Sequence, residues 1–171
     1  LPIVIRSTPT TPPLLSDTRA PASRGGVPVS GDYAFVADDA SGLLLIDISD
    51  PTNPTPPANY DTPGEAVALT VSGDYAFVAD GDSGLQVIDI SDPTNPTLLG
   101  NYDTPGSAWD VTVSGDHAFV ADGDSGLLVI DISHPTNPTL LGNYDTPGYA
   151  RGVTVSGDHA FLADDDSAAL G

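Results

Sequence analysis

Two short acidic loops are the first places in this sequence where side chains could do chemistry. Asp80 and Asp82 stand two residues apart ahead of a glycine, and Asp122 and Asp124 repeat the pattern. Carboxylates at this spacing are typical of calcium-binding loops, but no acidic residue follows where an EF-hand has its bidentate glutamate. The same pattern is typical of a hairpin turn in which aspartate bonds backbone N–H groups. We favour the turn; weak Ca²⁺ binding is the alternative, and Ca²⁺ is the only cofactor suggested.

A second candidate site consists of the positions at which otherwise nearly identical segments of the chain differ. These positions are Glu65, then Trp109 and Asp110, then Tyr149 and Arg151. Trp109 is the only tryptophan, and Arg151 is the only arginine outside the N-terminal segment. If these positions meet at the mouth of a channel through the fold, their aromatic and polar side chains could hold a small ligand or a glycan. The alternative is sequence drift at loop positions that packing hardly constrains.

Catalytic chemistry has little support in the sequence. There is no cysteine, and His117 and His159 stand where other copies of the segment carry tyrosine, which is typical of packing or surface positions. No nucleophile–base pair and no metal cluster is apparent. We therefore expect a protein that is not an enzyme, and a lyase or hydrolase is the third hypothesis. The formal net charge of −20 argues against nucleic acid and anionic membranes as partners.

A 42-residue repeat organises the chain and places these candidate sites. The tripeptide Ser-Gly-Asp recurs in steps of 42 residues, beginning at Ser30, Ser72, Ser114 and Ser156. Alternating apolar residues between turn formers predict four strands in one repeat, over residues 66–72, 75–80, 85–91 and 97–102. Four strands in a repeat of this length are typical of a β-propeller blade. We therefore expect an all-β fold, a β-propeller of four four-stranded blades.

One of these four blades is expected to be split between the two ends of the chain. Shifted by three periods, Ile3, Val4 and Ile5 align with residues 129–131, which lie in a third strand. The C-terminal repeat supplies a first strand, residues 150–156, and a second, residues 159–164. We therefore divide a single propeller domain, 1–171, into an N-terminal half-blade (1–22), three full blades (23–63, 64–105 and 106–147) and a C-terminal half-blade (148–171).

The two half-blades are expected to meet, because neither satisfies its strand edge alone. Ile3, Val4 and Ile5 on one side, and Phe161 and Leu162 on the other, are the residues expected at this junction. A tight turn from blade to blade would join the halves within one chain. A gentler turn would join them between chains, in a larger ring or a fibre. The sequence leaves both arrangements open, so the partner is either the protein itself or none.

Three segments carry a resemblance to a known family. They read Leu-Leu-Leu-Ile-Asp at 43–47, Leu-Gln-Val-Ile-Asp at 85–89 and Leu-Leu-Val-Ile-Asp at 127–131, with Ser-Asp-Pro or Ser-His-Pro shortly after. They resemble the LVIVD repeat of bacterial and archaeal surface and secreted proteins. The resemblance covers residues 27–167, and in the N-terminal half-blade Ile5 replaces the aspartate. It implies β-propeller blades, without catalytic residues or a single established activity.

A location outside the cell or at its surface is the expectation for this chain. No apolar run approaches the ~18–20 residues that cross a bilayer, so membrane insertion is not expected. The chain has no methionine, which suggests a fragment or a mature protein whose secretory signal has been removed. We expect a structural propeller that self-assembles through its half-blades, and a glycan- or ligand-binding adhesion module is the alternative.

Overall fold

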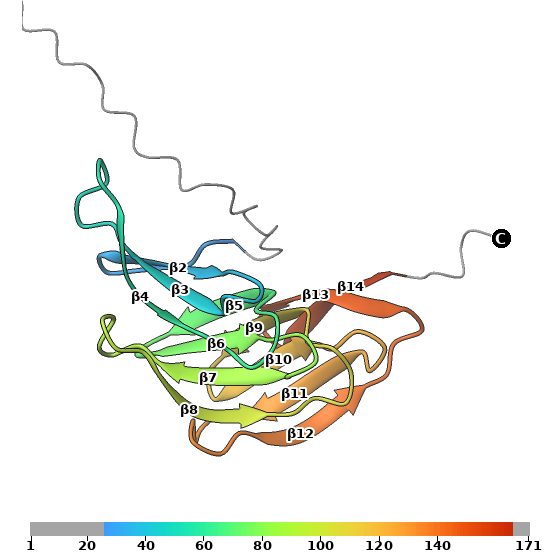
Figure 1. The fold of residues 1–171 in the computed structure, drawn as a ribbon. Coiled ribbons are helices and arrows are strands. Elements are labelled where there is room, and N and C mark those ends of the chain that lie inside the picture. The colour runs from blue at the N-terminus through green and yellow to red at the C-terminus, as the bar shows by residue number, and fades with distance from the viewer. Residues whose placement is uncertain (1–25, 166–171) are drawn as a thin grey trace, which may run out of the picture.

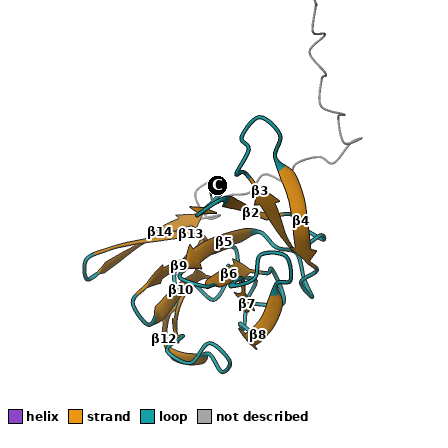
Figure 2. Ribbon diagram, turned by 90° about the vertical axis from the view of Figure 1, so that its left-hand side faces the viewer, coloured by secondary structure: helices purple, strands orange, loops and turns teal. Residues whose placement is uncertain are grey.

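The computed structural model describes residues 26–165, and every regular element in this part of the chain is a β-strand. Figure 1 shows the strands as a series of small sheets, and Figure 2 shows only strands and loops in the coloured part. The expected N-terminal half-blade, with Ile3, Val4 and Ile5, lies outside the described residues. Within the described part, no helix is long and apolar enough to cross a membrane.

Three four-stranded antiparallel sheets and one hairpin make up the fold. The first sheet comprises β1 (Val29–Ser30), β2 (Tyr33–Ala37), β3 (Leu43–Asp47) and β4 (Thr55–Tyr60). The second comprises β5 (Ala68–Ser72), β6 (Tyr75–Ala79), β7 (Leu85–Asp89) and β8 (Thr97–Tyr102). The third comprises β9 (Asp110–Ser114), β10 (His117–Ala121), β11 (Leu127–Asp131) and β12 (Thr139–Tyr144). The hairpin comprises β13 (Tyr149–Ser156) and β14 (His159–Asp165).

Each sheet is a meander in which consecutive strands pair, as expected for propeller blades. The second strand of a blade pairs on both sides: β6 bonds β5 through Ser72↔Tyr75 and bonds β7 through Ala79↔Leu85. The strand boundaries agree with the repeat-based prediction to within two residues. We refer to the three sheets as the first, second and third blades and to β13–β14 as the terminal hairpin.

The acidic loop between the second and third strands turns the chain with the help of a glycine. Gly84 has a φ of +72°, a conformation that L side chains rarely adopt, and its N–H bonds to Gly81 O. A Cβ atom at Gly84 would lie 2.3 Å from Tyr102 O, so the fourth strand can come this close only because no side chain is present. Gly84 therefore allows the loop to lie against the end of β8, the outer strand of the blade.

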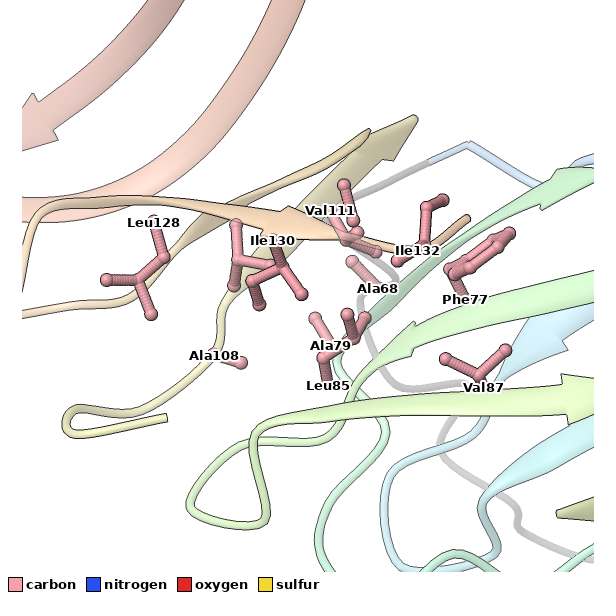
Figure 3. Close-up of a cluster of buried hydrophobic side chains, with 12 residues drawn as sticks. Ala68, Phe77, Ala79, Leu85, Val87, Ala108, Val111, Leu128, Ile130 and Ile132 are labelled. Carbon is pink, nitrogen blue, oxygen red and sulfur yellow. The ribbon is translucent and has the colours of Figure 1, made fainter. Parts of the chain in front are cut away.

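The blades stack face to face, and each interface is a separate apolar core. One core joins the first and second blades, one joins the second and third, and a smaller one joins the third blade to the terminal hairpin. In the second of these, Phe77 and Val87 lie across from Val111 and Ile132 of the next blade (Figure 3). The third strand of the second blade, β7, is buried on both faces, as expected, because Val87 and Ile88 contact opposite neighbours.

Short backbone bridges join successive blades. The turn after each second strand pairs with the residue ahead of the next first strand, through Asp39↔Ala66, Gly81↔Ala108 and Gly123↔Ala150. The last two bridges have reciprocal N–H···O bonds of 2.9–3.2 Å. These contacts place the start of each first strand against the preceding blade. Residues at equivalent positions of successive repeats are thereby brought side by side.

Candidate functional site

Trp109, Tyr149 and Arg151 form one cluster between the third blade and the terminal hairpin. Trp109 Nε1 donates a 2.7 Å hydrogen bond to Tyr149 Oη, and their rings meet edge to face at a centroid distance of 5.8 Å. The guanidinium carbon of Arg151 lies 5.3 Å from the Trp109 ring centroid and 4.8 Å from that of Tyr149. Both distances are within the range of a cation–π contact. The three side chains therefore contact one another.

Arg151 also makes an ion pair within the hairpin. Its Nε lies 3.2 Å from Asp165 Oδ2, at the far end of the strand that pairs with β13. Both groups are solvent-exposed, so the pair contributes little free energy by itself. Its main effect is on geometry, because it fixes the direction of the guanidinium above the two rings.

Asp110, beside Trp109, binds the backbone of two blades. Its Oδ1 accepts a hydrogen bond from Val111 N and its Oδ2 accepts one from Val153 N, both at 2.9 Å. Burial raises the pKa of Asp110, and the two amides partly offset this effect. The equivalent residue in the hairpin is Gly152, where a Cβ atom would lie 3.7 Å from Asp110 Oδ2. Asp110 thus acts as a clamp between the third blade and β13.

The fifth residue of the expected rim, Glu65, is not part of this cluster. It is exposed at the start of the second blade, and its side chain makes no hydrogen bond or ion pair with the described residues. The structure therefore brings together Trp109, Tyr149 and Arg151. Asp110 adjoins Trp109 in sequence but bonds backbone amides instead, and Glu65 lies one blade away.

The first aspartate of each acidic loop is held by the turn that precedes its blade. Asp80 Oδ1 accepts a 2.5 Å hydrogen bond from Thr62 Oγ1, and its Oδ2 accepts one of 2.9 Å from Gly64 N. Asp164 in the hairpin repeats this arrangement with Thr146 and Gly148. The sequence analysis missed these threonines; their signal is the Asp-Thr-Pro-Gly turn, which recurs with the same 42-residue period.

Asp122 is the third member of this set. Its Oδ2 accepts a 2.8 Å hydrogen bond from Gly106 N, and its side chain is fully buried, like that of Asp80. Burial raises the pKa of both Asp80 and Asp122, and hydrogen bonds to the carboxylates work against that rise. These two carboxylates therefore bond the turn 16–18 residues earlier rather than the backbone of their own loop.

Asp82 and Asp124, the other two expected calcium ligands, are not buried in the way that Asp80 and Asp122 are. Both are exposed in the same loops. Among residues 26–165, no group of three or more His, Cys, Asp or Glu side chains is arranged to hold a metal ion. Calcium binding by these loops stays a prediction, which a calcium titration of the protein would test.

The outer edge of the terminal hairpin has no neighbour among residues 26–165. β14 pairs with β13 from Ser156↔His159 to Tyr149↔Asp165, and no described strand pairs with its other edge. Phe161 is 56% exposed, whereas its equivalents Phe35 and Phe77 are 2% exposed. Leu162 is partly buried against the third blade. Of the five residues expected at the junction, two lie in β14: among the described residues nothing covers Phe161, whereas Leu162 packs against the third blade.

The repeat assignment can now be tested against known families. Four consecutive matches to the LVIVD repeat cover residues 23–62, 63–104, 105–146 and 147–168. The chain belongs to the LVIVD-repeat family. No curated protein matches it.

Solved structures share the fold of this LVIVD-repeat chain at low sequence identity. The computationally designed protein Ika4 has a TM-score of 0.68 and 13% identity, over 89% of this chain and 90% of that one. The computationally designed Ika8 has a TM-score of 0.65 and 12% identity, over 82% of this chain and 42% of that one. BamB from Moraxella catarrhalis has a TM-score of 0.62 and 16% identity, over 83% and 44%. The LVIVD-repeat chain thus spans less than half of the last two and shares a β-propeller fold with them.

Proposed function

We propose that this protein is a non-enzymatic structural β-propeller module, located outside the cell or at its surface, which assembles by completing its terminal half-blade. The N-terminal segment supplies the missing third and fourth strands. The unpaired edge of β14, with Phe161 exposed beside it, is the observation that carries this proposal. The LVIVD family assignment supports the location.

The terminal hairpin lacks what every other blade has. In the first three blades the second strand lies between two hydrogen-bonded neighbours, whereas β14 has one among the described residues. Ala160 is exposed, although its equivalents Ala76 and Ala118 are fully buried. An unpaired strand edge beside exposed apolar side chains is a template for another strand. Phe161 is 56% exposed, so covering the rest of its side chain contributes about 1–2 kcal/mol.

The N-terminal segment has the residues that a third strand needs. In the 42-residue register, Ile3 and Val4 fall on Val87 and Ile88 of the second blade, both fully buried. The charges also match, since residues 1–25 carry three arginines and one aspartate. The rest of the chain carries one arginine and 23 acidic residues, so the segment is attracted to the body of the protein.

A surface hollow beside the hairpin supports the same assignment. Between the second and third blades, a hollow at the equivalent place has a wall formed by Ile132, Ser133 and Pro135. The hollow between the third blade and the hairpin is lined from those two elements only. In the repeat register, Ser7 and Pro9 take the places of Ser133 and Pro135. The N-terminal segment would therefore supply the third wall.

Hydrogen–deuterium exchange of the intact protein tests this proposal. We expect the amides of His159–Asp165 to exchange slowly, and Val4→Asp to speed their exchange by disrupting the added strand. Thr10→Asp is the matched control, because it adds the same charge at a position equivalent to the exposed Thr136. Fast exchange of this strand in the unmodified protein, unchanged by Val4→Asp, would sink the proposal.

A non-enzymatic role agrees with the chemistry of the described residues. The carboxyl groups whose pKa is raised, Asp80, Asp110 and Asp122, accept hydrogen bonds from backbone amides of their own fold. Ligand binding by the Trp109 cluster stays the alternative. It predicts that Trp109→Ala abolishes retention on a glycan array and leaves the exchange of β14 unchanged.

A further inference from the structure

The first blade has an open face that the sequence analysis did not identify. Val27, just ahead of β1, is 52% exposed. Its equivalents in the following repeats are Leu69, Val111 and Val153, which are 6%, 4% and 8% exposed. The same position is therefore buried in every repeat except the first.

Each of these equivalent residues packs against the blade that precedes it. Leu69 belongs to the core that contains Phe35 of the first blade, and Val111 belongs to the core that contains Phe77 of the second. Val153 packs with Ala121 of the third blade. Val27 is therefore half of an inter-blade interface whose other half, a preceding blade, is absent from the described part of the chain.

The terminal hairpin presents the other half of such an interface. Phe35 with Ala37, and Phe77 with Ala79, face the blade that follows each of them. Phe161 and Ala163 hold the same positions in β14, and both are exposed. The described chain thus has three filled interfaces and two unfilled halves of a fourth, one at each end of the stack.

We propose that the terminal hairpin of one chain packs against the first blade of a second copy of the same chain, head to tail. This inference rests on the proposed completion of the half-blade and names its partner. A single chain does not bring the two halves together: Val27 and Phe161 are both exposed, and no apolar core joins the first blade to the hairpin among residues 26–165. The partner is the copy that carries the matching face.

The length of the arc fits two copies in a ring of twice this chain's length, although the similar protein Ika4 is covered over 90% of its own length. The exposure of Val27 and Phe161 is what favours two copies. Most of this chain superposes on 42% of one larger propeller and on 44% of another. Two such arcs, with their half-blades completed, come close to the length of either chain. A head-to-tail contact is heterologous, so it ends in a closed ring when the rotation from blade to blade divides the circle. Two copies thus leave neither open face exposed.

Cysteine cross-linking of the full chain tests this inference, because the natural sequence has no cysteine. The double variant Val27→Cys/Phe161→Cys is treated with a short bismaleimide and separated on a denaturing gel. We expect the link to form between chains. A mixture of the two single variants should give the same two-chain product, and neither single variant alone should. Leu141→Cys replaces Phe161→Cys as the control, since Leu141 is equally exposed but lies on the outer strand β12.

Each other outcome separates this inference from the proposed function when the exchange of β14 is measured on the same samples. A link within one chain, with β14 protected, overturns the second copy and leaves the completed half-blade standing. The absence of any link, with β14 unprotected, overturns both. Both cysteines replace exposed residues, so a circular dichroism spectrum unchanged from the natural protein verifies that the variants are folded.

Discussion

Trp109 Nε1 donates a 2.7 Å hydrogen bond to Tyr149 Oη across the boundary between the third blade and the terminal hairpin. The two residues are 40 positions apart, so they are not equivalent in the 42-residue repeat. Arg151, which is equivalent to Trp109, covers both rings. The cluster joins the hairpin to the blade beside a core with only three buried members, Ala121, Ala150 and Val153, among the described residues. Its side chains therefore stabilise the position of the hairpin.

Tyr149→Phe tests this stabilising role. The change removes the hydroxyl that accepts the Trp109 bond and keeps the ring, so we expect a loss of about 0.5–1 kcal/mol in the free energy of unfolding. Tyr144→Phe is the control, because Tyr144 is exposed on β12 and should change stability by less than about 0.5 kcal/mol. Denaturant unfolding at a fixed chain concentration measures both. Equal effects would contradict the role of the Trp109–Tyr149 bond.

Asp80→Ala should be far more costly, because it leaves Thr62 Oγ1 and Gly64 N without their acceptor in a buried site. Each unsatisfied buried donor costs about 1–3 kcal/mol, so the expected loss is about 2–5 kcal/mol. Asp80→Asn should cost less, since its side-chain oxygen still accepts one of the two bonds. The exposed Asp82→Ala, in the same loop, should be nearly neutral. A large loss for Asp82→Ala instead would point to a bound ion at the loop.

Stability should depend on pH in two opposite ways. Burial raises the pKa of Asp80, Asp110 and Asp122 above the ordinary value of 3.8, so the folded state holds these protons more tightly than the unfolded state. The free energy of unfolding should therefore rise as the pH falls from neutral through their raised pKa values. Relief of repulsion among the excess acidic groups acts in the same direction.

Below pH 3.8 the turn aspartates reverse this trend. Their pKa is lowered by hydrogen bonds from the side chain and the backbone amide of the residue two positions along; they are Asp47, Asp50, Asp89, Asp92 and Asp131. The stability that they contribute is present above 3.8 and is lost as the pH falls through their lowered pKa values. The melting temperature, measured across pH 2–7, should have its maximum near pH 3.8. In Asp80→Asn the increase in melting temperature between neutral pH and this maximum should be smaller. A monotonic decline from neutral pH would contradict this account.

Gly84→Ala should unfold the second blade or cost more than about 3 kcal/mol. A Cβ atom there would meet Tyr102 O at 2.3 Å and Thr104 N at 2.6 Å, and both are backbone atoms. Gly73→Ala is the matched control, since Gly73 also has a positive φ but no atom lies within 4 Å of its Cβ position. That control should cost only about 1–2 kcal/mol from the left-handed backbone. Similar losses for the two variants would mean that the contact with the fourth strand is not rigid.

The blades could be predicted from the sequence because the period repeats every local signal. Glycine turns, alternating apolar residues and the Asp-Pro turns recur at the same offsets, so the strands between them are fixed almost to the residue. The Trp109 cluster could be predicted in part, since Trp109 and Arg151 differ from the consensus at one position. Its bond to Tyr149 could not, because that contact joins non-equivalent positions of two repeats and depends on how the blades stack.

The hydrogen bonds that hold the acidic loops show a second limit of prediction from the sequence. Asp80 and Thr62 are 18 residues apart, and only the packing of the turn against the hairpin loop that follows it makes them neighbours. The open face at Val27 shows a third, since the residue resembles Leu69 in type and register. It differs in having no blade in front of it among residues 26–165, which depends on the arrangement of the blades rather than on the local sequence.

The mass of the native particle tests the central claim most directly. Multi-angle light scattering of the full chain should give the mass of two chains, because the hairpin of each copy then covers the first blade of the other. Charging that face with Val27→Asp should reduce the mass to one chain, while Leu141→Asp should leave it unchanged. A natural protein with the mass of a single chain at all concentrations would contradict the assembly of two copies, and the exchange of β14 would then show whether the half-blade is completed within one chain.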